Sequence, residues 1–210
     1  MKKFLYLFFL SIIFLFFSIV IYLSSIGYET SKFNNLVIKE IKKKTPKVNL
    51  ELEKIKIKID IKKIQLFLST NNPQITYQNI KIPIKEIKIF TKIDKLLNSK
   101  IEINQIIFVI EKFKIPDIQK LSTRIKPSNF KTYLLNNLYG GEIEKGLFDL
   151  NIDSDFNLVD YKANGSIKKI NILVKKNFEI KDISFNFKID NNLSLINSIK
   201  ASHKDINISN

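Results

Sequence analysis

The sequence predicts a mainly β protein, in which an N-terminal transmembrane helix is followed by a long antiparallel β-sheet with a few short helices. The first observation behind this is an uncharged run of twenty residues, Phe4 to Leu23. The second is a strict alternation of Ile with Lys or other polar residues from Val48 onward, which is typical of strands with one apolar face. The third is the small number of segments with a helical pattern, which leaves strands as the main element.

The apolar run has the length of a membrane span. Twenty helical residues at about 1.5 Å each cross a hydrocarbon core of roughly 30 Å. A cleaved signal peptide is the alternative, because Lys2 and Lys3 form a basic start. The apolar part of a signal peptide is usually about 7–15 residues and precedes an A-x-A-like site, whereas here only Ser25-Ile26-Gly27 resembles one. We therefore expect residues 1–27 to be an uncleaved anchor.

The positive charges around the run give opposing indications of its orientation. Lys2 and Lys3 favour a cytoplasmic N-terminus, since cytoplasmic flanks carry an excess of Lys and Arg. Four lysines after the run favour the opposite orientation, namely Lys32, Lys39, Lys42 and Lys43. A basic stub followed directly by an apolar run is how export signals begin, so we expect the rest of the chain to be translocated.

The net charge of +15 does not indicate a nucleic-acid partner. Of the 35 basic residues only Arg124 is an arginine, and nucleic-acid readers use Arg for bidentate contacts to phosphate and guanine. An excess of Ile, Lys and Asn is what an AT-rich genome encodes, so the lysines are interpreted first as solvated strand faces. Attraction to anionic lipid headgroups is the second interpretation. Cysteine is absent, which excludes disulfides and thiolate metal sites.

Residues 28–46 are expected to form a juxtamembrane segment with a helix over 28–44. An apolar stripe at helical spacing indicates this helix, and its members are Phe33, Leu36, Val37 and Ile41. Thr45-Pro46 is expected to end it, because the residue before proline is disfavoured in the helical conformation.

From Val48 the period changes to two, and we expect strands in the ranges 48–52, 55–61, 64–68, 75–77, 80–84 and 87–89. The parity changes at Glu53-Lys54, which indicates a bulge or a turn. A turn is expected at Thr70-Asn71-Asn72-Pro73. Pro83 lacks a backbone donor and so marks an edge, a bulge or a strand start.

The second half of the chain is expected to contain the remaining helices and strands. Helical patterns lie at 91–99, 117–121 and 127–138, the last ending at Gly140-Gly141. Strand patterns lie at 101–103, 106–110, 113–115, 147–152, 156–163, 166–174, 177–189, 193–201 and 206–208. Turns are expected at Asp153-Ser154-Asp155, Asn164-Gly165, Lys175-Lys176 and Asn191-Asn192.

One apolar face along so many strands must be covered or occupied. The helical segments are too few to cover about a dozen strands, so the sheet either folds on itself as a sandwich or barrel, or curls into a trough that holds something apolar. The residues expected to line such a trough share strand parity, and they are Ile55, Ile57, Ile59, Ile61, Ile80, Ile82 and Ile84. The core of an ordinary β-sandwich is the alternative for the same residues.

The sequence carries no motif of an enzyme, a metal centre or a phosphate loop. His203 is the single histidine, so a catalytic triad and a multi-His metal site within one chain are excluded. Asp153-Ser154-Asp155 lacks the later Gly and Glu of a calcium loop and is interpreted as a hairpin turn. We therefore expect neither catalysis nor a cofactor or metal.

The chain resembles the N-terminal region of AsmA-like proteins of Gram-negative bacteria, the family of TamB and YhdP. The matching features are the anchor, the helix that ends before Pro46, and three later segments: NNPQITYQNIKIPIKEIKIF, IDKLLNSKIEINQIIFVI and IKPSNFKTYLLNNLYGGEIE. The resemblance implies that residues 47–210 form a repeating β-groove, a long curled sheet that is incomplete at its C-terminus.

The same resemblance implies a function. Such proteins sit in the inner membrane with their body in the periplasm, bind lipid acyl chains in the groove, and support phospholipid transport to, and integrity of, the outer membrane. The implied partners are lipids, the membrane and a further groove-forming or outer-membrane protein. The alternative is a membrane-anchored β-sandwich that acts as a scaffold or assembly factor without lipid cargo.

Overall fold

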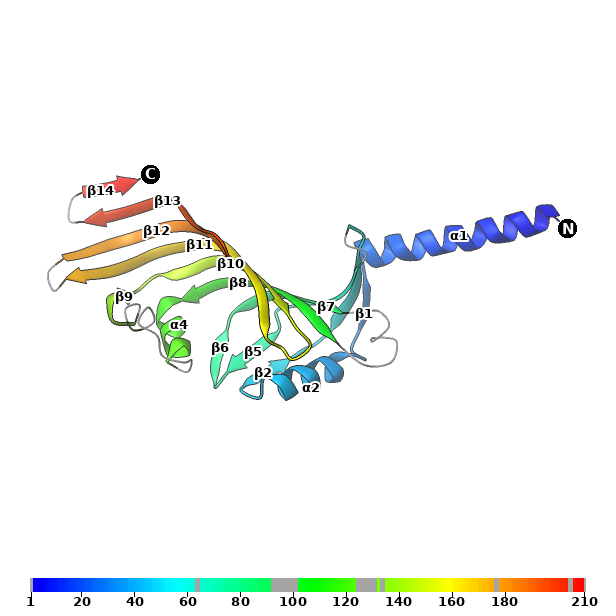
Figure 1. Cartoon of the computed structure of the whole chain (residues 1–210), viewed down its shortest axis with the longest axis horizontal. Helices are drawn as coiled ribbons and strands as arrows, with labels where there is room; N and C mark the ends of the chain where they lie inside the picture. Colours follow the sequence, from blue (N-terminus) through cyan, green and yellow to red (C-terminus); the bar gives the residue numbers. More distant parts are fainter. Residues whose placement is uncertain are drawn as a thin grey trace.

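The N-terminal helix α1 spans Lys2–Ser25 and stands apart from the rest of the chain (Figure 1). In the computed structural model, residues 2–62, 65–91, 102–123, 132, 135–175, 178–203 and 206–209 are described. Within α1, residues Lys3–Ser25 are apolar enough and long enough to cross a membrane, and none of this segment is buried. The expected membrane-spanning helix is therefore present as a helix of spanning length.

The segment after α1 corrects one expectation, because the second helix does not begin at residue 28. Tyr28–Thr30 form a short strand, β1, that pairs with β3 (Ile55–Asp60). Gly27 ends α1 with a φ of 82°, a conformation that residues with a side chain rarely adopt, and it turns the chain into β1. The helix α2 then covers Asn34–Lys44 and ends before Pro46, as the sequence predicts.

A small three-stranded sheet follows α2 and packs beside it (Figure 1). Its order is β2-β5-β6, with β2 at Val48–Glu51, β5 at Gln74–Tyr77 and β6 at Ile80–Ile82. The parity change at Glu53-Lys54 marks the passage of the chain from this sheet to β3 in the large sheet. Pro83 marks a second passage in the same direction, from β6 to β7 (Ile84–Thr91). Glu53-Lys54 and Pro83, the two positions at which the sequence interrupts a strand pattern, thus both lie between the two sheets.

In the described part of the chain, the large sheet has eleven antiparallel strands and does not close into a barrel. Its main path runs β1-β3-β4-β7-β8-β10-β11-β12-β13-β14, and β9 pairs with β11 off this path. The strands not yet located are β4 (Gln65–Asn71), β8 (Ile103–Lys114), β9 (Leu138–Tyr139), β10 (Glu142–Ile152), β11 (Leu158–Lys175), β12 (Phe178–Asp190), β13 (Ser194–His203) and β14 (Ile206–Ser209).

The helical patterns of the second half are described only in part. The pattern at 117–121 is confirmed as α4, Ile115–Ser122. Residues 92–99 of the first pattern lie outside the described residues, as do 127–131 and 133–134 of the last one. The last pattern is helical at 135–137, and Leu138, which the sequence places in this helix, begins β9 instead.

The turn expected at Asn164-Gly165 is wrong, because both residues lie inside β11. Gly165 allows two strands to approach closely and does not reverse the chain direction. Gly165 pairs with Gly146 of β10, and a Cβ at Gly165 would lie 2.3 Å from the carbonyl oxygen of Lys145. Only glycine fits at this point. The turns at Asp153 and Asn191 are confirmed, and residues 176–177 lie outside the described residues.

A line of β-bulges crosses the long strands and bends the sheet. Four residues with φ between 51° and 54° occur in neighbouring strands: Lys112 of β8, Lys169 of β11, Asp182 of β12 and Ser198 of β13. The strand pairing shifts near Lys169, Asp182 and Ser198, and also between Ile143 and Lys145 of β10. Since a bulge bends and twists its strand, this line gives the sheet its fold across the middle (Figure 1).

Candidate functional site: the apolar face of the large sheet

One face of the large sheet carries most of the apolar side chains on its described strands, and we call it the inner face. Residues directly opposite one another in paired strands share a face, so the strand register identifies it as three rows across the strands. The first row is Ile57, Leu68, Ile89, Ile106, Leu150 and Tyr161. The second is Thr70, Ile87, Phe108, Phe148, Ala163 and Ile189. The third is Ile84, Ile110, Gly146, Gly165, Phe187 and Ile196.

The opposite face, the outer face, is mainly polar. A matching row there runs from β3 to β12 through Lys56, Ser69, Lys88, Ile107, Asp149, Lys162 and Asp190. Oppositely charged side chains pair on this side, as between Lys85 and Glu111 at 2.8 Å. The outer face also contains an aromatic pair, Phe67 and Phe90, whose ring centroids lie 5.1 Å apart. The alternation of the sequence therefore separates an apolar from a polar face, as expected.

The first part of the inner face, over β3, β4, β7 and β8, is covered by the chain itself. Helix α2 and the small sheet lie against it (Figure 1). Val37 of α2 is fully buried, and Leu50 and Ile75 of the small sheet are buried with it. They pack in one cluster with Ile55, Leu68, Ile87, Ile89, Ile103 and Ile152. We call this part the covered segment.

The residues predicted to line a trough are divided by the structure. Ile55 is buried in the cluster of the covered segment, and Ile57, Ile82 and Ile84 pack against it from both sheets. Ile59 is half-buried in β3, and Ile80 is half-buried in β6 opposite Tyr77. Ile61 lies beyond β3 in a turn and is 56% exposed. Four of the seven residues thus meet between two sheets, where helix and sheet already fill the space beside them.

The second part of the inner face, over β11 to β13, carries apolar residues that lie outside both described clusters. These residues are Tyr161, Phe187, Ile189 and Ile196, and we call them the open segment. The first three are half-buried, and Ile196 is 53% exposed. Beyond the line of bulges, α4 packs through Ile115 against Ile170 and Ile183. The open segment therefore lies between two covered regions of the same sheet.

Strand alternation contains the signal for the open segment, but the signal is equally strong elsewhere. Phe185-Asn186-Phe187-Lys188-Ile189 alternates as regularly as Ile55-Lys56-Ile57. Which run stays uncovered depends on where α2 and the small sheet pack. The sequence contains the two glycines of the third row, but it does not show that aromatic rings lie beside them. The rings of Phe148 and Phe187 lie beside Gly146 and Gly165, where they occupy the space of the missing side chains.

Charged groups flank the sheet without forming a reactive cluster among the described residues. The Lys56 ammonium lies 3.0 Å from Glu29 and lowers the pKa of that carboxyl. Lys168 and Ser166 act similarly on the pKa of Glu144. The pKa of Tyr139 is raised, because its hydroxyl is hydrogen-bonded to Glu179. Among the described residues, no group of three His, Asp or Glu side chains is arranged to hold a metal ion.

A polar hollow of about 470 Å³ lies on the outer face and is the alternative location for a site. Its lining combines Asn71, Asn72, Lys85, Glu86, Val109, Glu111, Lys145 and Leu147. The lysines and glutamates in it balance in number, and Lys85 is already bound to Glu111. This hollow offers no excess charge for an ion, so the inner face remains the stronger candidate.

Comparison with known proteins gives no relative: no family model, no curated protein and no solved structure matches this chain.

Proposed function

We propose that this protein is a membrane-anchored lipid-binding protein, whose open segment contacts the acyl chains of phospholipids. The observation that carries the proposal is the set of three apolar rows that continue from the covered segment into the open segment, the third as far as Ile196. Contact with apolar chains is non-directional and contributes about 25 cal/mol per Å² of buried surface, so such a face needs no specific polar group. No catalytic step is part of the proposed function.

The direction of the rows supports the proposal. Helix α1 leaves the sheet at its β1 edge, and the rows cross the strands from there toward β13 (Figure 1). The open segment covers three neighbouring strands, β11 to β13, and so extends about 10 Å across the strands at about 4.8 Å spacing. The acyl chains of one leaflet span about half of a roughly 30 Å hydrocarbon core, so the open segment is long enough to contact part of one lipid tail.

The resemblance to AsmA-like proteins leads to the finer proposal. We propose that α1 is a single-pass anchor in a bacterial inner membrane, that the sheet lies in the periplasm, and that the protein supports phospholipid transport toward the outer membrane. A periplasm-specific reporter fused after Asn210 is expected to be active. Activity of a cytoplasm-specific reporter alone at that position would exclude both the location and the transport route.

Photo-crosslinking tests the lipid-binding face directly. A benzophenone side chain is placed in the full chain either at Ile196, on the inner face, or at Leu195, on the outer face. The two residues are neighbours in β13 with similar exposure, 53% and 45%, so they form a matched pair. After irradiation in native membranes, mass spectrometry is expected to find phospholipid attached at position 196 and not at position 195.

The outcomes separate the proposal from its alternative. Equal lipid attachment at both positions would mean nonspecific contact with the bilayer and would refute the assigned face. A protein adduct at position 196 without lipid would favour the scaffold, for which the exposed apolar residues of β13 provide an independent argument. A second variant, Phe187→Asp, is expected to lower lipid attachment at position 196 several-fold, because it places a charge in the same row.

A further inference from the structure

The C-terminal end of α1 is built directly onto the large sheet. The backbone N–H groups of Ile26 and Gly27 both donate to the carbonyl oxygen of Tyr22, at 2.9 and 3.0 Å, and they end the helix. A Cβ at Gly27 would lie 2.8 Å from Cγ of Lys58 and 3.0 Å from the carbonyl oxygen of Ile57. This close approach shows that α1 ends in contact with β3.

Lys58 strengthens the same joint through its charge. Its Nζ donates to the carbonyl oxygen of Ser25 at 3.1 Å. The last carbonyls of a helix have no partner within the helix and carry the negative end of its dipole, so an ammonium group is favourable there. The sheet is therefore held against the end of α1 by packing and by a charge-assisted hydrogen bond.

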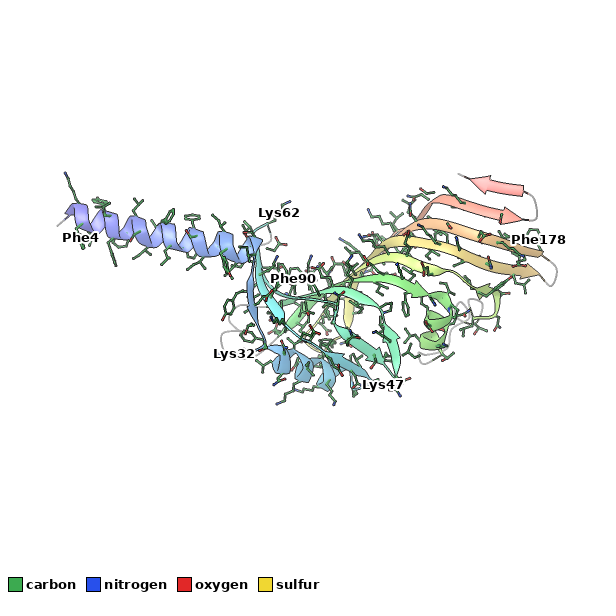
Figure 2. The ribbon with its side chains drawn as sticks, turned by 180° about the vertical axis from the view of Figure 1, so that it is seen from behind. Phe4, Lys32, Lys47, Lys62, Phe90 and Phe178 are labelled. Carbon is green, nitrogen blue, oxygen red and sulfur yellow. The ribbon has the colours of Figure 1, made fainter. Side chains whose placement is uncertain are left out.

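The turn after β3 lies beside this joint. From Lys58 the strand continues to Asp60 and then turns through Ile61 to Lys62, which Figure 2 shows close to the end of α1. Asp60 stabilises the turn, because its Oδ1 accepts a hydrogen bond from the backbone N–H of Lys62 at 3.0 Å. The turn thus has a defined place relative to the helix.

Large apolar side chains are exposed around the joint. Ile26 is 60% exposed, and Tyr28 and Ile61 are each 56% exposed. Ile26 and Tyr28 follow directly after a helix of membrane-spanning length, and Ile61 lies in the turn beside the end of that helix. Lys62 adds a positive charge at the same place, and Lys62 is exposed. Aromatic and apolar residues combined with snorkelling lysines are typical of the boundary between acyl chains and headgroups.

We propose that this joint is a second membrane contact, in which Ile26, Tyr28 and Ile61 enter the headgroup layer and Lys62 binds the phosphates of anionic phospholipids. The inference rests on the proposed membrane span of α1, since the bilayer that α1 crosses is the partner next to the joint. Charge complementarity favours anionic lipid over zwitterionic lipid as the occupant.

The contact would set the orientation of the whole sheet. An anchor helix alone leaves the body free to tilt and rotate about the end of the helix. Seating Ile61 and Lys62 at the bilayer surface keeps the β1 edge of the sheet toward the membrane. The three apolar rows would then lead away from the bilayer instead of lying along it.

The experiment uses single cysteines in the full chain, which contains no native cysteine. An environment-sensitive fluorophore is attached at Ser11, in the middle of α1, at Ile61, or at Lys47, which Figure 2 places away from α1. The protein is reconstituted in phosphatidylcholine vesicles with and without phosphatidylglycerol, and quenching by lipids carrying a doxyl group is measured. The proposal expects quenching at Ser11 and Ile61 and none at Lys47.

The charge of Lys62 is tested separately. With the probe at Ile61, Lys62→Glu is expected to lower the ratio of quenched to unquenched probe at least about fivefold in vesicles with phosphatidylglycerol. Lys47→Glu makes the same change of charge at a site away from the joint and is expected to have no effect on this ratio. The effect of Lys62→Glu is expected to disappear in pure phosphatidylcholine.

The positions also distinguish the two proposals. Quenching at Ser11 without quenching at Ile61 would overturn the second membrane contact and leave the anchor intact. Absence of quenching at Ser11 would overturn the anchor itself. An equal response to Lys62→Glu and Lys47→Glu would show that net charge, and not the joint, attracts the lipid, and would refute the assigned role of Lys62.

Discussion

The covered and open segments of the inner face are built from the same kind of strand but have different environments. Ile55 and Leu68 in the covered segment are each 2% exposed, whereas Ile196 in the open segment is 53% exposed. The residues on these strands alternate with equal regularity. The difference arises from α2 and the small sheet, which pack on one segment and not on the other. Strand periodicity thus specifies which face is apolar, and the covering elements decide whether that face is a core.

The largest expected difference between the segments is in their tolerance of charge. Leu68→Asp would bury a carboxylate in the cluster of the covered segment, and we expect it to lower the free energy of unfolding by more than about 4 kcal/mol. Ile196→Asp places the same group where water reaches it and is expected to change stability by less than about 0.5 kcal/mol. Chemical denaturation of the full-length variants in detergent, followed by circular dichroism, measures both effects.

A similar loss of stability in the two variants would show that Ile196 is part of a core, which would end the distinction between the segments. Leu68→Ala serves as the control for lost volume. It is expected to cost about 3 kcal/mol, because it leaves a cavity without introducing a charge.

Gly165 lies on the third row in β11, where the open segment borders β10, and its replacement tests how the two segments are joined. In Gly165→Ala the new Cβ would lie 2.3 Å from the carbonyl oxygen of Lys145 and 2.9 Å from Cα of Gly146. Backbone atoms cannot move aside as a flexible side chain can, so β10 and β11 must separate. We expect a loss of about 3 kcal/mol. The exposed neighbour Asn164, replaced by Ala, is the matched control. Unchanged stability in Gly165→Ala would mean that this close approach does not exist.

Much of the fold could be predicted because local chemistry determines it. The uncharged run predicts α1, the alternation predicts the strands, and Pro83 and Glu53-Lys54 mark the passages between sheets. The start of α2 could not be predicted, because Tyr28–Thr30 is a strand only through its pairing with β3. The line of bulges could not be predicted either. Lys112 and Lys169 are ordinary residues, and their left-handed conformation follows from contacts between strands and not from their own preferences.

The candidate site was predictable only as a type of surface. Choosing Ile55, Ile57 and Ile82 correctly identified apolar strand faces, but the pattern could not show that Val37 of α2 would pack among them. The open part of the face is carried by Phe187 and Ile196 instead, because neither belongs to a cluster formed by the described residues. Such long-range packing has no local signal in a single sequence.

Replacing Asn34 would weaken the attachment of α2 to the covered segment without changing any residue of that segment. Its Nδ2 donates to the carbonyl oxygens of Leu52 and Glu53, at 2.8 and 3.1 Å, and so attaches α2 to the passage between the sheets. Asn34→Ala is expected to cost about 1–2 kcal/mol, because it leaves carbonyl groups in a partly buried place without this donor. The adjacent Asn35 is exposed, and Asn35→Ala is the control. Equal unfolding midpoints for the two variants would show that Asn34 does not hold the cover.

The smallest expected effect concerns the pH dependence of the turns that flank the two segments. Asp190 ends β12 beside the open segment, and its Oδ1 accepts hydrogen bonds from the backbone N–H groups of Asn192 and Leu193, both at 2.9 Å. These bonds lower the pKa of Asp190 below its ordinary value. Asp153 has the corresponding place in the turn between β10 and β11, where Asn157 lowers its pKa.

A carboxyl with a lowered folded-state pKa stabilises the protein at pH values above its ordinary pKa, and the contribution is lost as the pH falls through the lowered value. Asp190→Asn is therefore expected to reduce stability at pH 7, and the difference from the unchanged protein should disappear in acid. Asp153→Asn should behave in the same way, and Asp155→Asn, whose carboxylate accepts none of these bonds, should not. Urea midpoints measured from pH 7 down to acid provide the test. If the open segment unfolds before the covered one, Asp190→Asn will shift only the first part of the unfolding transition, and Asp153→Asn will shift only the second part. A single shared transition for both variants would show that the two segments unfold as one unit.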